Sequence, residues 1–284
     1  NVTLRESSAT APNEVALPLG TPLLVGADTH GEFEIAAELL RNHKIIDDQL
    51  RWSFGKGHLV LLGDVFDRGA RQTEILWLIY QLEAEAQRAG GGVHLLLGNH
   101  ESMVLSGDDR YLNPKYRQSA KILGAHSYAA LWDETSLLGQ WLRSKAAIMK
   151  VGSYLCMHGG LSPHAVELRL TLEAMNSTVR DVLRSKQPLP PERHALASFV
   201  LGPAGPLWYR GYFGDMRDQG GPAQATSEDV RRVREHYGAE RIFVGHTKVP
   251  TFTALYGGDV IAVQVYPHRD PQTGAAAMEA IRVE

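Results

Sequence analysis

Residues 58–69 read HLVLLGDVFDRG, in which an apolar run ends at Asp64 and continues to Asp67 and Arg68. An apolar run of this length, followed by glycine, predicts a strand that is buried on both faces. The carboxylate of Asp64 then lies at the end of a buried strand, where an unpaired charge is costly. A metal ion would offset that cost, and a position bridging two cations would offset it better.

The segments on both sides of this stretch repeat the same pattern. TPLLVG (21–26) and VHLLL (93–97) are further apolar runs, and apolar residues at helical spacing predict helices over 33–43 and 71–89. Glycines at 90–92 are a typical helix C-terminal signal. The resulting β-α-β-α-β order, with apolar strands, predicts an α/β protein whose sheet is covered on both faces.

The rest of the chain is expected to complete the same domain. We expect an N-terminal arm over 1–20 and a single domain over 21–284, because no repeat or low-complexity tract divides the chain. Residues 103–145 read as a helical insertion that carries several aromatic residues, and 187–192 as a proline-rich loop. The remaining predicted elements are a hairpin over 146–157, helices over 168–183 and 227–237, and strands over 241–244, 251–256, 260–266 and 277–283.

Five short polar motifs, each directly after an apolar run, contain side chains that bind metals. They are Asp28-Thr29-His30-Gly31, Gly63-Asp64-Val65-Phe66-Asp67-Arg68-Gly69, Gly98-Asn99-His100-Glu101, His158-Gly159-Gly160 and Gly245-His246-Thr247. Ligands in open α/β sheets bind beyond the carboxyl ends of the strands, which is where these motifs fall. Each motif alone is also compatible with a surface turn. Together, their mixed oxygen and nitrogen donors favour a pair of borderline divalent ions.

Three residues within these motifs have features suited to a phosphate group. Arg68 offers a planar fork that matches phosphate oxygens, although it is also compatible with a surface ion pair to Asp67. His100 is a candidate general acid, with Asp67 available as its orienting carboxylate.

Composition limits the other functional classes. The chain has 284 residues, a net charge of −3 and a pI near 6.5, which gives no electrostatic footprint for nucleic acid. No apolar stretch approaches the roughly 18–20 residues of a membrane-spanning helix. The single cysteine, Cys156, lies within an apolar run and is expected to be a buried hydrophobe rather than a nucleophile.

The motif series resembles a known family. Gly-Asp-x-x-Asp-Arg-Gly (63–69), Gly-Asn-His-Glu (98–101) and His-Gly-Gly-Leu-Ser-Pro (158–163) are similar to calcineurin-like metallophosphoesterases of the phosphoprotein phosphatase type. The glutamate in Gly-Asn-His-Glu resembles the protein phosphatase branch more than the diadenosine tetraphosphatase branch, which usually has aspartate there. Within the protein phosphatase branch, the segment LWYRG (207–211) and the lack of a Ser-Ala-Pro-Asn-Tyr segment resemble the Shewanella-like bacterial protein phosphatases. Ala27 departs from the family pattern, which usually has glycine directly before the first aspartate.

This resemblance implies a fold and an assignment of roles. The fold would be a four-layer αββα sandwich, with two mixed β-sheets flanked by helices and a helical insertion. The cofactors would be two divalent or mixed-valence ions (Mn, Fe or Zn). Asp64 would bridge them, with Asp28 and His30 on the first ion and Asn99, His158 and His246 on the second. Arg68 and Arg210 would hold the phosphate, and His100 with Asp67 would serve the leaving group. Arg210 is also compatible with a structural role, stacked on Trp208 or Tyr209.

The function implied is a dinuclear-metal phosphomonoesterase, with direct attack on phosphorus by a hydroxide that bridges the ions. The expected substrate is a phosphorylated protein or peptide, with phosphotyrosine favoured over phosphoserine and phosphothreonine, or a small phosphomonoester. The alternatives are a phosphodiesterase or diadenosine polyphosphate hydrolase on the same core, and a catalytically silent phosphate-binding scaffold. We expect no nucleic-acid partner, and the sequence leaves the oligomeric state open. Because the chain starts at Asn1 and relatives are often exported, a periplasmic or exported location is expected rather than a cytoplasmic one.

Overall fold

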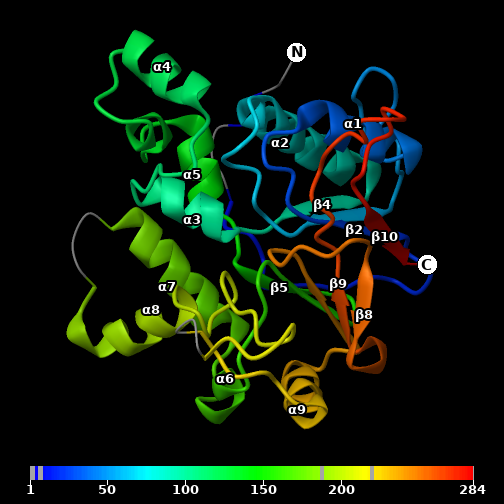
Figure 1. The fold of residues 1–284 in the computed structure, drawn as a ribbon, viewed down its shortest axis with the longest axis vertical. Coiled ribbons are helices and arrows are strands. Elements are labelled where there is room, and N and C mark those ends of the chain that lie inside the picture. Colours follow the sequence, from blue (N-terminus) through cyan, green and yellow to red (C-terminus); the bar gives the residue numbers. More distant parts are fainter. Residues whose placement is uncertain (1–3, 6–8, 186–188, 218–220, 284) are drawn as a thin grey trace.

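A computed structural model describes residues 4–5, 9–185, 189–217 and 221–283. Parts of the expected N-terminal arm (1–3 and 6–8) and of the proline-rich loop (187–188) therefore lie outside the described residues. The chain forms two β-sheets packed face to face, with helices on the outer side of each (Figure 1). The predicted sandwich of two mixed sheets flanked by helices is confirmed.

The four-stranded sheet is built from the β-α-β-α-β run and the C-terminal strand. Its order is β10-β2-β3-β4, in which β2, β3 and β4 are parallel and β10 is antiparallel to β2. Its strands are β2 (Leu23–Gly26), β3 (His58–Leu61), β4 (Gly92–Leu95) and β10 (Ala280–Val283). Helices α1 (Phe33–Asn42) and α2 (Gln72–Ala89) cover its outer face. Helix α2 ends at Gly90, which has a φ of 81° that glycine adopts without strain.

The six-stranded sheet has the order β1-β5-β6-β7-β9-β8 and mixes parallel and antiparallel pairs. Its strands are β1 (Glu14–Val15), β5 (Ile148–Val151), β6 (Tyr154–Met157), β7 (Arg241–Val244), β8 (Thr253–Leu255) and β9 (Val260–Ala262). The strand predicted over 260–266 ends at Ala262, because the backbone turns where Val265 N–H donates to the Val263 carbonyl. On its outer side lie α6 (His164–Glu167), α7 (Leu172–Arg184), α8 (His194–Val200) and α9 (Ser227–Tyr237) (Figure 1).

The insertion after β4 consists of short helices joined by loops. Its elements are α3 (Asn99–Leu105), α4 (Pro114–Ile122), the 3₁₀ helix η1 (Ala129–Trp132) and α5 (Leu137–Arg143). Two further 3₁₀ helices are η2 (Pro191–Arg193) and η4 (Tyr256–Gly258). Of the aromatic residues in the predicted insertion over 103–145, Tyr116, Tyr128, Trp132 and Trp141 are buried in the core, whereas Tyr111 is exposed.

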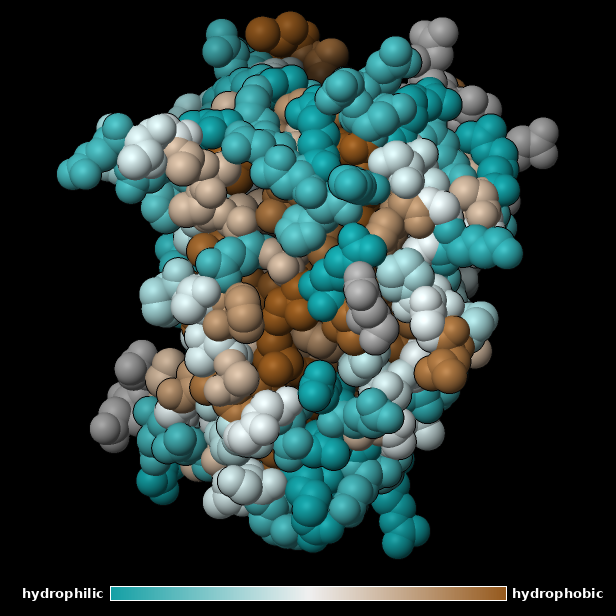
Figure 2. All heavy atoms as spheres, turned by 90° about the vertical axis from the view of Figure 1, so that its right-hand side faces the viewer, coloured by the Kyte–Doolittle hydropathy of each residue, from teal (hydrophilic) through white to brown (hydrophobic). Residues whose placement is uncertain are grey.

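Strand side chains alternate between the two layers of the core. In β2, Leu23 and Val25 point between the sheets, whereas Leu24 points toward the helices. Viewed from the side on which β8 and β10 lie, hydrophobic residues gather in the middle of this face, and hydrophilic residues cover most of the rest of it (Figure 2). No helix in the described part of the chain combines the length and apolar character that crossing a bilayer requires.

Candidate metal centre

The polar motifs meet where the strands of both sheets end. Motif residues follow β2, β3 and β4 in one sheet and β6 and β7 in the other, so five separate segments converge. All six predicted metal ligands are buried, with exposed fractions of 0–8%. These residues are Asp28, His30, Asp64, Asn99, His158 and His246.

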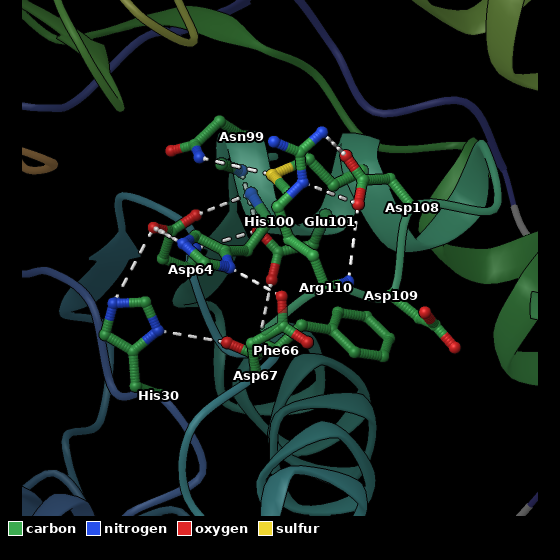
Figure 3. Close-up of polar contacts among 12 residues, drawn as sticks. His30, Asp64, Phe66, Asp67, Asn99, His100, Glu101, Asp108, Asp109 and Arg110 are labelled. Carbon is green, nitrogen blue, oxygen red and sulfur yellow. Dashed lines mark hydrogen bonds and ion pairs between the residues drawn. The ribbon is translucent and has the colours of Figure 1, made fainter. Parts of the chain in front are cut away.

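Asp64 lies at the centre of this group. Its Oδ2 is 3.2 Å from His158 Nε2 and 3.8 Å from His30 Nε2, and Figure 3 shows the His30 side of this arrangement. Two sets of mutually close ligand atoms both include Asp64: one adds His30 and His100, the other His158 and His246. Asp64 is thus the residue that the two sets have in common.

The histidine ring nitrogens are oriented by backbone carbonyls. His30 Nδ1 lies 3.0 Å from the Phe66 carbonyl and His158 Nδ1 lies 2.8 Å from the Leu62 carbonyl. A carbonyl only accepts, so each Nδ1 is the protonated nitrogen and each Nε2 presents a lone pair to the centre.

His158 Nε2 therefore points a lone pair at other electron-rich atoms. It lies 2.9 Å from Asn99 Oδ1 and 3.1 Å from His246 Nδ1. Atoms that bind one ion at about 2.1 Å lie roughly 3–3.5 Å apart, which matches these separations. Nearby Asp64 and Asp28 outweigh burial and raise the pKa of His158 to about 9, so a cation or a proton is needed at this point. The donor set fits a divalent metal ion.

Asp28 lies at the edge of the cluster. Its Oδ2 is 3.8 Å from His30 Nε2, and its Oδ1 accepts a hydrogen bond of 3.2 Å from the His246 N–H. Burial raises the pKa of Asp28 to about 7, against the opposing effect of His158. The first close set contains His100, whose Nε2 lies 3.8 Å from Asp64 Oδ2, and does not contain Asp28.

His100 and Asp67 form the pair expected from the sequence. Their Nδ1 and Oδ2 atoms are 2.6 Å apart, and the His100 backbone N–H donates to Asp64 Oδ1 at 3.0 Å (Figure 3). Burial would lower the pKa of His100, but the hydrogen bond to Asp67 and the nearby charge of Asp64 raise it above its ordinary value. A histidine held in this way can carry and donate a proton from Nε2.

The two candidate phosphate-binding arginines are both at the rim. Arg68 is exposed, and its Cζ lies 5.7 Å from the ring centre of Tyr111 and 5.8 Å from that of Tyr266. Arg210 donates a hydrogen bond of 3.1 Å to Thr247 Oγ1. Among the described contacts Arg210 has no cation–π contact with Trp208 or Tyr209, so the stacked alternative is not what the structure shows.

Glu101 is a site residue whose structural role the sequence did not reveal. Its fully buried carboxylate accepts four backbone hydrogen bonds. The donors are the N–H groups of Asp64 (2.8 Å), Val65 (2.7 Å), Phe66 (3.1 Å) and Gly98 (2.7 Å). It thereby joins the ends of β3 and β4.

The backbone of the centre is strained, and glycines allow the segments to approach. Among the described non-glycine residues with positive φ, five belong to the motifs, including Asp64 (54°) and His246 (60°). Such strain concentrates at functional sites. A Cβ added to Gly98 would lie 2.1 Å from Asp64 Oδ1, so no larger residue fits at that position.

A buried cluster of carboxylate, amide and imidazole side chains at the strand ends of this double sheet is typical of a metal-dependent phosphoesterase. Residues 21–250 match the calcineurin-like phosphoesterase family, and the chain belongs to that family. The family match and the similarity to solved and curated protein phosphatases identify the domain as a hydrolytic phosphatase.

The relatives include solved structures and curated proteins. A cold-active protein-tyrosine phosphatase of a psychrophilic Shewanella species is 35% identical, with a TM-score of 0.85, covering 97% of this chain and 78% of that one. Uncharacterized protein C1840.07c of Schizosaccharomyces pombe is 28% identical over 82% of this chain and 69% of its own length. Shewanella-like protein phosphatase 1 of Plasmodium berghei is 27% identical over 79% of this chain and 60% of its own length. The predicted resemblance is confirmed, although the chain spans less than two thirds of the Plasmodium protein.

Proposed function

We propose that this domain is a two-metal phosphomonoesterase that acts on phosphorylated proteins or peptides and prefers phosphotyrosine. The observation that carries the proposal is the position of Asp64, whose carboxylate is common to both sets of close ligand atoms. The similarity to a protein-tyrosine phosphatase over nearly the whole chain supports the choice of substrate.

Six side chains would hold the two ions. Asp28, His30 and Asp64 would bind the first, and Asp64, Asn99, His158 and His246 the second. Mn, Fe and Zn all suit this mixture of carboxylate, amide and imidazole donors. When bound, such a pair of ions supplies Lewis acidity and activates water for in-line displacement at phosphorus.

The residues at the rim would bind and protonate the substrate. Arg68 and Arg210 would offer guanidinium N–H groups to the phosphate oxygens. His100 would donate its Nε2 proton to the leaving oxygen, while Asp67 keeps the Nδ1 proton in place. No cysteine nucleophile is required, since burial raises the pKa of Cys156 to about 12.

Two features favour an aryl leaving group. Tyr111 is 48% exposed, and its ring centre lies 5.3 Å from that of His100, so an aromatic surface adjoins the proton donor. On the other side, a cavity of about 460 Å³ adjoins Arg210 and is walled partly by Trp208, Leu201 and Pro203. Aromatic rings stack favourably with such surfaces.

The test is a panel of phosphotyrosine, phosphoserine and phosphothreonine peptides of one sequence, with metal analysis of the same preparation. We expect two metal equivalents per chain and the highest kcat/KM on phosphotyrosine. Asp64→Asn should lose metal and turnover together. Full activity with metal retained in that variant, or faster turnover of bis-p-nitrophenyl phosphate or diadenosine tetraphosphate than of the peptides, would refute the proposal.

A further inference from the structure

Tyr266 connects the metal centre with a lysine that has no assigned role. Its ring centre is 5.8 Å from that of His30 and 4.1 Å from Lys248 Nζ. The two distances place the ammonium no more than about 10 Å from the His30 ring. Lys248 follows His246 by two residues, so the chain that carries a predicted ligand also carries this charge.

Lys248 has no anionic partner in the part of the chain that the structure describes. Its side chain is exposed, and no carboxylate among the described residues lies within 4.0 Å of its ammonium. By contrast, Lys115, Lys145 and Lys150 are each paired with a glutamate. The ring face of Tyr266 attracts the positive charge of Lys248, but it offers no oxygen that would accept a hydrogen bond from the three ammonium N–H groups.

A second cation lies on the same ring. Arg68 Cζ is 5.8 Å from the centre of Tyr266, so the two positive side chains share one aromatic ring beside the metal centre. Like charges held near each other are stabilised by an anion between or beside them. The phosphate would satisfy Arg68, which leaves Lys248 for a second negative group on the same substrate.

The distance from the centre indicates which group that is. Residues in an extended peptide are spaced by about 3.3–3.6 Å, so side chains next to a phosphorylated residue reach several ångströms from the phosphorus. A carboxylate on such a neighbour falls within the range of Lys248. A positive charge on the rim also raises the rate at which anionic substrates arrive.

We propose that Lys248 is a specificity-determining residue that binds a carboxylate next to the phosphorylated residue, so that the preferred substrates are acidic phosphopeptides. This inference rests on the phosphatase function proposed above. Tyr266 is the positioning residue, because its ring holds the ammonium beside the centre.

The experiment compares phosphotyrosine peptides that differ only in having Glu or Gln on both sides of the phosphotyrosine. Wild type should prefer the Glu peptide about three- to fivefold in kcat/KM, mostly through KM, as for a solvent-exposed ion pair. The preference should shrink in 0.5 M NaCl, where such pairs are screened. Lys248→Met should bring the ratio near one, and Lys248→Arg should retain it.

Matched variants separate this role from a general charge effect. Lys56→Met removes an exposed lysine that precedes β3, whereas Asp64 follows the other end of that strand. This variant should keep the full preference. Lys248→Glu should reverse the charge preference, so that this variant favours a phosphotyrosine peptide flanked by Lys over one flanked by Glu. Tyr266→Phe keeps the ring and should keep the ratio, whereas Tyr266→Leu should reduce it.

Two outcomes overturn the inference in distinguishable ways. If wild type hydrolyses the Gln peptide but does not favour the Glu peptide, or if Lys248→Met retains the preference, Lys248 does not select the substrate. If wild type hydrolyses none of the phosphopeptides while binding metal, the proposed function itself fails.

Discussion

Replacing Glu101 with glutamine tests whether this carboxylate holds the metal centre in place. Its Oε2 accepts the N–H groups of Asp64 and Gly98, and its Oε1 those of Val65 and Phe66. Glutamine has nearly the same shape, but its NH₂ group only donates. Whichever way the amide is turned, the NH₂ faces two backbone donors, so two hydrogen bonds are lost.

The expected cost follows from this count. Hydrogen bonds to a charged acceptor contribute about 1.5–3 kcal/mol each, so two lost bonds correspond to about 3–6 kcal/mol. Part of this loss is offset, because burial and the nearby charge of Asp64 raise the pKa of Glu101, and the neutral amide avoids both penalties. We therefore expect Glu101→Gln to lower the free energy of unfolding by about 3 kcal/mol, at the lower end of that range.

The second consequence concerns metal binding. Asp64 has a φ of 54°, and Glu101 accepts its backbone N–H, so the loss should release the turn that aims the Asp64 carboxylate. Residues that orient metal ligands typically contribute 10- to 100-fold in affinity. Urea unfolding of the metal-free proteins and calorimetric metal titration measure the two effects.

Glu85→Gln is the matched control for this variant. Glu85 is a buried glutamate on α2 that accepts a backbone hydrogen bond from Trp52, at a distance of 2.8 Å. The Glu85→Gln variant should have a lower free energy of unfolding than wild type but unchanged metal affinity. A Glu101→Gln protein within about 1 kcal/mol of wild type, with unchanged metal affinity, would show that the four contacts do not organise the site.

Three further predictions use other parts of the structure. His100→Ala should lower kcat about 10²-fold or more on phenyl phosphate and much less on p-nitrophenyl phosphate, whose leaving group needs no proton; equal losses would exclude a general acid. Cys156, whose pKa burial raises to about 12, should react with a thiol reagent at pH 8 only after unfolding, and rapid labelling of the native protein would contradict its burial. Burial lowers the pKa of His94 from 6.5 to about 3. As the pH drops below 6.5, His94 is therefore protonated in the unfolded chain before it is protonated in the folded protein, so the free energy of unfolding falls. His94→Gln should therefore show a shallower loss of stability between pH 6.5 and 4 in urea unfolding, and an unchanged slope would argue against a half-buried His94 that stays neutral.

Apolar runs and the residues that end them carried most of the fold prediction. The strands over 58–62 and 93–97 and the helix over 71–89 were predictable because burial and helical spacing are local properties. The assignment of strands to one sheet or the other was not predictable from such local properties. The predicted strands over 251–256 and 277–283 look alike in sequence, yet β8 joins the six-stranded sheet and β10 pairs with β2 in the other. That choice depends on contacts between residues far apart in the chain.

The same distinction separates the predicted and missed parts of the site. Ligand-type residues next to strand ends were visible as motifs, and the structure brings all six together. The sequence showed Glu101 as part of a motif but not its structural role, because its hydrogen-bond partners include backbone groups 35–37 positions away. Tyr266 and Lys248 lie in loops without a motif, and only the fold places them side by side.

The stretch 58–69 organises the centre through its backbone as much as through its side chains. Besides Asp64, it supplies the Leu62 and Phe66 carbonyls that orient His158 and His30. The Asp64 carbonyl also accepts the N–H of His30. Because histidines from both sheets depend on carbonyls of this one segment, a shift of a single residue within it would misdirect ligands on separate strands. The segment is therefore expected to tolerate change poorly for two reasons: it carries Asp64, a predicted ligand, and its main chain orients the predicted ligands His30 and His158 on other strands.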